Sequence, residues 1–97
     1  MVAAVPDLTL PPRLDLPAST ALLAQLKDLA ATDEDCRLRA HEVTTVGTAC
    51  LQTLLAFDQA LINRGRRFTL VEPSQAMRDG MLQLGMEPEM TRWMGTA

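Results

Sequence analysis

Apolar residues recur at the spacing of an amphipathic helix in three parts of the chain. The first stripe lies between residues 17 and 31, the second between residues 51 and 62, and the third between residues 75 and 84. Residues three and four positions apart share one face of a helix, so each stripe predicts a helix that packs on one side. The stripes comprise Leu22, Leu23, Leu26, Leu29 and Ala30; Leu51, Leu54, Leu55, Leu61 and Ile62; and Met77, Met81 and Leu84.

Capping and helix-breaking residues indicate where these helices begin and end. Pro17 or Ser19 is expected to begin the first helix, and residues 32–35 to end it. Gly65 is a typical C-terminal signal for the second helix. Ser74 supplies a capping hydroxyl for the third helix, and Gly85 is expected to stop it.

Shorter segments with an alternating pattern precede the helices and predict strands. Residues 7–16 form two alternating pieces that are broken by Pro11 and Pro12, so we expect a strand pair or a hairpin there. Residues 36–43, CRLRAHEV, alternate apolar and polar side chains as a half-buried strand does. Residues 66–71, RRFTLV, predict another compact strand.

The order of these elements predicts an α/β fold, with a small mixed β-sheet of about four strands and helices packed on one face. We expect a single domain over residues 1–97, with residues 1–6 and 87–97 as candidate loose termini. Residues 86–97 are expected to form either a short docking helix or a loosely held tail. Within them, Met90, Trp93 and Met94 are candidates for an exposed apolar patch, whereas Met77 and Met81 are expected in the core.

Composition narrows the classes of function. The chain is 47% apolar and 22% charged, with a net charge of -3, so it has neither the composition of a disordered chain nor the basic excess of a nucleic-acid-binding protein. No apolar run approaches the roughly 20 residues that span a bilayer, and residues 1–10 do not resemble a signal peptide. We therefore expect a cytoplasmic protein with no membrane insertion.

Few residues are available for catalysis or metal binding. Cys36 and Cys50 lack the spacing of a zinc or redox motif and are expected to be buried thiols. His41 is the single histidine and the chain has no tyrosine. Glu42 follows His41 on a predicted strand, where adjacent side chains point to opposite faces, so the two should not converge. We expect no enzyme activity, no metal and no cofactor.

A basic cluster of Arg64, Arg66 and Arg67 follows the second predicted helix. These arginines could bind phosphate, but positive side chains also complement the negative end of a helix dipole. We favour the role at a helix end.

Thr48 precedes the leucine-rich helix and allows two interpretations. A side-chain oxygen at the first turn of a helix accepts hydrogen bonds from its unpaired amides, which makes Thr48 a candidate cap. A phosphate on the same hydroxyl would be stabilised by the same amides and would add roughly -1.5 to -2 charges to the surface. Thr48 is therefore either a cap or unmodified contact residue, or a phosphorylation site that controls docking.

The segment VTTVGTACLQTLLAFDQALINRGRRFTLVEPSQAMRDGMLQLGM resembles the signature of STAS domains, the fold of bacterial anti-sigma-factor antagonists and of the cytoplasmic tails of sulfate transporters. In that family a strand leads into a short loop, and a leucine then begins a long amphipathic helix. The corresponding residues are Gly47, Thr48, Ala49, Cys50 and Leu51. The earlier LPPRLDLPASTALLAQL is similar to the family's opening strands and first helix. The likeness is greatest to short stand-alone members, including those found beside chemotaxis and lipid-transport genes.

The resemblance implies a non-enzymatic bacterial signalling module that binds a protein partner through the loop 44–50 and the following helix. The partner would be an anti-sigma-type kinase, a chemotaxis or two-component protein, or an ATPase subunit. A partner kinase phosphorylates the family position that Thr48 occupies, but Gly47 replaces the usual acidic neighbour, and Glu42 is the nearest carboxylate ahead of the loop. The contact residues implied are Thr44, Thr45, Gly47, Thr48, Ala49 and Gln52.

Two alternatives remain open at this point. The chain could be an accessory subunit of a lipid-transport ATPase or a chemotaxis-associated protein that docks without phosphorylation. It could also be a small-ligand or nucleotide-binding domain whose helix N-terminus holds an anion, although Gly47 stands alone where a phosphate loop is glycine-rich. The oligomeric state is left open.

Overall fold

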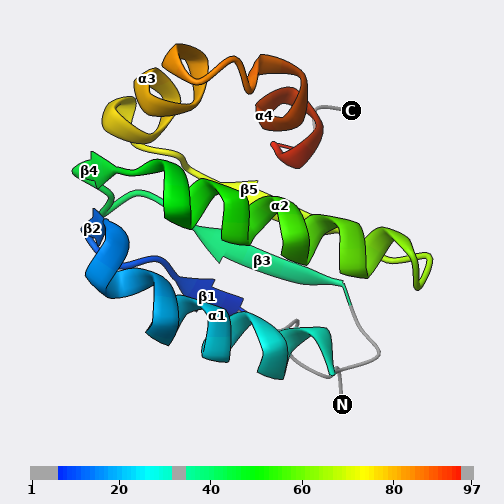
Figure 1. Ribbon diagram of the computed structural model, residues 1–97. Helices are drawn as coiled ribbons and strands as arrows, with labels where there is room; N and C mark the ends of the chain where they lie inside the picture. The colour runs from blue at the N-terminus through cyan, green and yellow to red at the C-terminus, as the bar shows by residue number, and fades with distance from the viewer. Residues whose placement is uncertain (1–6, 32–34, 95–97) are drawn as a thin grey trace.

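The computed structural model describes residues 7–31 and 35–94, which fold into small parallel sheets covered by helices (Figure 1). The elements in chain order are β1 (Asp7–Thr9), β2 (Arg13–Leu14), α1 (Leu16–Ala30), β3 (Cys36–Arg39), β4 (Thr45–Val46), α2 (Thr48–Ile62), β5 (Phe68–Val71), α3 (Gln75–Gln83) and α4 (Glu87–Trp93). The predicted α/β class is confirmed. The strands are shorter than predicted and form two sheets.

The larger sheet has the strand order β1-β3-β5, with both neighbouring pairs parallel. Leu38 at its centre lies beside Leu8 on one side and Leu70 on the other. Helices α1 and α2 pack together over one face of this sheet, as Figure 1 shows. This arrangement follows from parallel neighbours whose crossover helices have the same hand.

The smaller sheet corrects the prediction of a hairpin over residues 7–16. β2 pairs in parallel with β4, whereas β1 pairs with β3, so the two early strands do not pair with each other. Prolines lack the amide that a ladder needs, and the chain bends at Pro11 and Pro12. The Pro12 carbonyl instead accepts the amides of Thr44 and Thr45 at 2.7 and 3.1 Å.

A turn interrupts the strand that was predicted over residues 36–43. β3 ends at Arg39, and the backbone passes through a turn at residues 41–42 before β4 begins. The amide of Ala40 still bonds the carbonyl of Val71 at 3.0 Å, so the chain leaves the larger sheet at Ala40. The prediction was right about the strand but wrong about its length.

The helix ends follow local capping chemistry. Asp15 caps α1 by accepting the Ala18 amide at 3.2 Å, so the helix begins at Leu16, before the predicted Pro17 or Ser19. It ends at Ala30, whereas the predicted end falls largely on residues 32–34, outside the described residues. Gly65, with φ of 70°, follows the end of α2, and Ser74 caps α3, both as predicted.

The core lies between the sheet and the helices and includes both cysteines, Met77 and Met81, as predicted. Trp93 contradicts the expected exposed patch because only 1% of its surface is accessible. Its ring lies 4.9 Å from that of Phe68, which is 5.4 Å from that of Phe57. These aromatic contacts hold α4 against β5. In the described residues, no helix combines the length and the apolar character needed to cross a membrane.

Candidate functional site

The first turns of α1 and α2 lie side by side at the end of the β2–β4 pair (Figure 1). Two bonds hold them there. The Gly47 amide donates to the Leu14 carbonyl at 2.6 Å, and the Cys50 thiol donates to the Asp15 carbonyl at 3.2 Å. A Cβ at Gly47 would lie 3.1 Å from the Leu14 oxygen, so a glycine allows this close approach.

The six contact residues implied by the sequence fall on or beside this end of the molecule. Thr44, Thr45, Thr48 and Gln52 are exposed, whereas Gly47 and Ala49 are half-buried. The Thr44 hydroxyl donates to the Pro12 carbonyl at 3.1 Å, which fixes its orientation. Within residues 7–31 and 35–94, the hydroxyls of Thr45 and Thr48 have no hydrogen-bond partner. These polar atoms are available to another molecule.

The structure corrects the interpretation of Thr48 as a helix cap. Gly47 occupies the cap position with φ and ψ of -114° and 158°, and Thr48 is the first residue of the helix. No side chain caps α2, and its first turn contains no acidic residue. The amides of this first turn therefore receive no hydrogen bond from a capping side chain, and the positive end of the helix dipole has no acidic residue on α2 itself.

Leu16 is a feature of this end that the sequence reasoning missed. Its side chain is 72% exposed although it is large and apolar. Asp15 was the available signal, since an aspartate two residues ahead of Pro17 is a good cap and would have placed the helix start at Leu16. We define the docking surface as Leu16, Thr44, Thr45, Gly47, Thr48, Ala49 and Gln52.

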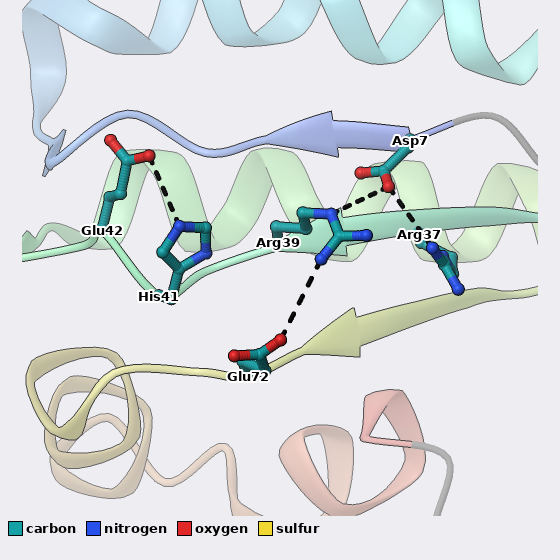
Figure 2. Close-up of polar contacts among 6 residues, drawn as sticks. All are labelled: Asp7, Arg37, Arg39, His41, Glu42 and Glu72. Atoms are coloured by element: carbon teal, nitrogen blue, oxygen red, sulfur yellow. Dashed lines mark hydrogen bonds and ion pairs between the residues drawn. The ribbon is translucent and has the colours of Figure 1, made fainter.

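The face of the larger sheet opposite α1 and α2 carries an ion-pair network (Figure 2). Asp7 accepts from Arg39 Nε at 2.8 Å and lies 3.5 Å from Arg37 Nη2. Arg39 Nη1 also lies 4.0 Å from a carboxylate oxygen of Glu72. The side chains alternate with the buried Cys36 and Leu38 on β3, as the strand period requires. Water screens such exposed pairs, so they give the face polarity more than stability.

His41 and Glu42 differ from the sequence prediction. They lie in the turn after β3 rather than on a strand, and their side chains approach within 3.5 Å (Figure 2). Both side chains are about half exposed. The Ser74 hydroxyl lies beside this turn but donates to the Val43 carbonyl at 2.6 Å. The described residues do not place three or more His, Cys, Asp or Glu side chains together as a metal site would require.

The basic cluster is located at a helix end, but the helix is α1 rather than α2. Arg64 Nη1 donates to the Ala30 carbonyl at 2.5 Å, and Arg66 Nη1 approaches the same oxygen at 3.5 Å. Positive charge is stabilised there because the last carbonyls of a helix lack amide partners. Arg66 and Arg67 also line a cavity beside the end of α2.

Comparison with known protein families gives a match over most of the chain. The family model described as "Mlab, STAS domain" matches residues 2–92, which includes the docking surface, both sheets and nearly all of α4. A search of curated proteins finds no significant match.

Proposed function

The chain belongs to the STAS domain family, and from this premise we propose that it is a non-enzymatic regulatory module that binds a protein partner through its docking surface. Members of this family are in general regulatory and not catalytic. One observation carries the proposal: unpaired polar atoms, an uncapped helix N-terminus and the exposed Leu16 occur together at one end of the molecule. Protein interfaces combine apolar anchors and polar groups in this way.

Leu16 would contribute affinity by leaving water when the partner binds. Burying a leucine side chain contributes about 1.5 to 3 kcal/mol. Thr45, Thr48 and Gln52 would contribute specificity, since a partner must satisfy their polar atoms when it excludes water from them. The half-buried Gly47 and Ala49 are small enough for a partner's backbone to approach closely.

Phosphorylation of Thr48 would then act as a gate for docking. The hydroxyl is exposed at the first position of α2, where the helix dipole favours a negative charge. A phosphate would therefore leave the fold intact while adding roughly -1.5 to -2 charges at the centre of the docking surface. The added charge would repel acidic groups of a partner, and burying it against apolar groups would cost free energy of desolvation.

A second candidate function is constitutive docking, in which Thr48 is never modified. Gly47 favours it, because this chain has no acidic residue beside Thr48 to present the hydroxyl to a kinase. The partner classes are the same as for the gated module: an anti-sigma-type kinase, a chemotaxis or two-component protein, or the ATPase subunit of a lipid-transport system. The lipid-transport ATPase would need a subunit that stays bound, rather than an antagonist that binds and dissociates.

A binding assay with Thr48 variants tests the gate. Each candidate partner is immobilised in turn, and binding of the purified protein is measured for the parent, Thr48→Glu and Thr48→Val. We expect Thr48→Glu to weaken binding by about tenfold or more, because it brings an unpaired charge into the interface. Thr48→Val should bind within a few-fold of the parent. Thr91→Glu, the same change at an exposed position on α4, is the control and should bind as the parent does.

Two further variants test the docking surface independently of the proposed gate at Thr48. They are Leu16→Asp and Gln52→Ala. If Thr48→Glu binds normally while both of these variants lose binding, docking is constitutive and the gate is wrong. If all three variants bind a confirmed partner as the parent does, the docking surface itself is wrong.

A further inference from the structure

A cavity of about 330 Å³ lies at the opposite end of α2 from the docking surface. Its walls come from the last turns of α2, the loop that leads from α2 to β5, the start of β5 and the end of α4. The 15 residues of α2 separate the two sites by roughly 20 Å along the helix axis. The volume is at the lower end of the range in which proteins bind small molecules, which is about 300–1,000 Å³.

The charged groups that line the cavity are predominantly basic. Arg66, Arg67 and Arg92 line it together with a single carboxylate, that of Asp58. Arg92 is ion-paired with Asp58, whose side chain is only 8% exposed, so this carboxylate is already neutralised. A second carboxylate, that of Asp35, lies nearby and accepts the Arg67 backbone amide at 3.0 Å. Arg67 therefore brings a guanidinium to the cavity that Asp58 does not neutralise, within a chain whose net charge is -3.

Arg67 is the guanidinium most available to a ligand. Its side chain makes no hydrogen bond or ion pair with any residue that the structure describes. Arginine binds phosphate and carboxylate groups through two parallel N–H donors, which gives the contact both strength and direction. The remaining wall is apolar and is formed by Ile62, Phe68 and Trp93.

Trp93 supplies a second, independent observation. It is 99% buried in the wall of the cavity, and its indole Nε1 has no hydrogen-bond partner among the described residues. A buried N–H without an acceptor is unfavourable, and proteins seldom leave one unless another group supplies the acceptor. The indole nitrogen is closed off from solvent in this structure, so side chains around it must shift before a ligand oxygen can accept its hydrogen.

We propose that this cavity is a binding site for a small amphipathic anion, a phosphate or carboxylate group attached to an apolar group of a few carbons. The anionic group binds Arg67 with support from Arg66 and Arg92. The apolar part packs on Ile62, Phe68 and Trp93. The site is independent of the docking surface because none of its lining residues belongs to that surface.

Intrinsic fluorescence offers a direct assay, because Trp93 is the only tryptophan and the chain has no tyrosine. The folded full chain is titrated with hexyl phosphate, hexanoate, inorganic phosphate and hexanol. We expect saturable changes in emission with the two amphipathic anions, with dissociation constants near or below about 1 mM. Inorganic phosphate should bind at least about tenfold more weakly, since it lacks the apolar part. Hexanol should not saturate, and added salt should weaken binding of the anions.

Two variants connect the signal to the cavity. Arg67→Gln should weaken hexyl phosphate binding about tenfold, the loss expected for one charge-assisted contact. Ile62→Asp places a negative charge on a side chain that is 43% exposed at the cavity and should abolish binding. Leu82→Asp is the matched control, since Leu82 is 47% exposed on α3, outside the cavity, and should bind normally. Thermal unfolding checks that all three variants fold.

The proposal is wrong if neither amphipathic anion gives a saturable signal, or if hexanol binds as tightly as hexyl phosphate. It is also wrong if folded Arg67→Gln and Ile62→Asp both bind as the parent does. None of these outcomes affects the proposal for the docking surface, because the assay contains no protein partner.

Discussion

At Gly80 the backbone of α3 approaches the side chain of Val46 on β4. An added Cβ would lie 2.8 Å from Val46 Cβ and 3.2 and 3.3 Å from its two methyl carbons. Helix propensity alone predicts that Gly80→Ala stabilises the protein by about 1 kcal/mol. Overpacking costs about 1–3 kcal/mol, and a β-branched side chain cannot easily rotate away. The cost of the steric overlap with Val46 should therefore exceed the gain in helix propensity. We expect Gly80→Ala to lower the free energy of unfolding by about 1 kcal/mol, measured in urea titrations.

The double variant decides whether contact with Val46 is the cause. Val46→Ala removes the methyl groups that the new Cβ would meet, so in that background Gly80→Ala should be neutral or stabilising. A Gly80→Ala variant that is more stable than the parent would show that α3 and β4 are not packed this closely.

Helix α3 is attached to the rest of the fold through Ser74. Its Oγ accepts the Met77 amide at 3.1 Å, and its hydroxyl donates to the Val43 carbonyl at 2.6 Å. Ser74→Ala removes the cap, which is worth about 1 kcal/mol, and leaves the Val43 carbonyl without this donor. We expect a loss of about 2 kcal/mol in the free energy of unfolding, measured by urea titration. Ser19→Ala is the control, because its hydroxyl bonds only the exposed Leu16 carbonyl within α1, and should change stability by less than about 0.5 kcal/mol. Equal effects would contradict a role for Ser74 in attaching α3.

The accuracy of sequence-based prediction differed between elements for a physical reason. Signals contained within one helix, such as the Ser74 cap and Gly65, could be recognised because they act on residues close by in the chain. The supposed hairpin could not be excluded, because the partner of Pro12 is Thr44, far along the sequence. Trp93 was misjudged for the same reason, since its burial depends on its contact with Phe68 across the fold.

The candidate site shows the same limit. The resemblance to the family made Thr48 and the loop candidates, and Thr48 is exposed at the first position of α2. Whether that hydroxyl caps the helix was not predictable, because the bond from Gly47 to Leu14 fixes the cap position from a distant strand. The cavity beside Trp93 was equally inaccessible to sequence reasoning, since α2, β5, α4 and the loop between α2 and β5 build its walls.

At the scale of the whole molecule, the two thiols lie in different layers of one continuous core. Cys36 is on β3 in the sheet and Cys50 is on α2, and both are at most 1% exposed. Burial raises the pKa of each thiol above its ordinary value. The pKa of Cys36 is also lowered somewhat by Arg66 and raised by Asp35, while Asp15 raises that of Cys50 further. The reactive thiolate is therefore scarce in the folded protein, and labelling requires the structure to open.

The labelling rates of the two thiols test whether the domain opens as one unit. Cys36→Ala leaves only Cys50, and Cys50→Ala leaves only Cys36. The rate at which a thiol-disulfide reagent labels each variant in native buffer therefore measures how often one layer of the core opens. When opening is global, each rate equals the rate of the unfolded chain multiplied by the unfolded fraction that urea titration gives for that variant. Both thiols should then show the same dependence on added urea. We expect this global behaviour, because both thiols belong to one continuous core. If Cys50 instead reacts about tenfold or more faster than this product, while Cys36 does not, the first turn of α2 opens by itself. The docking surface would then lie on a locally unstable segment, and our expectation of one cooperative unit would be wrong.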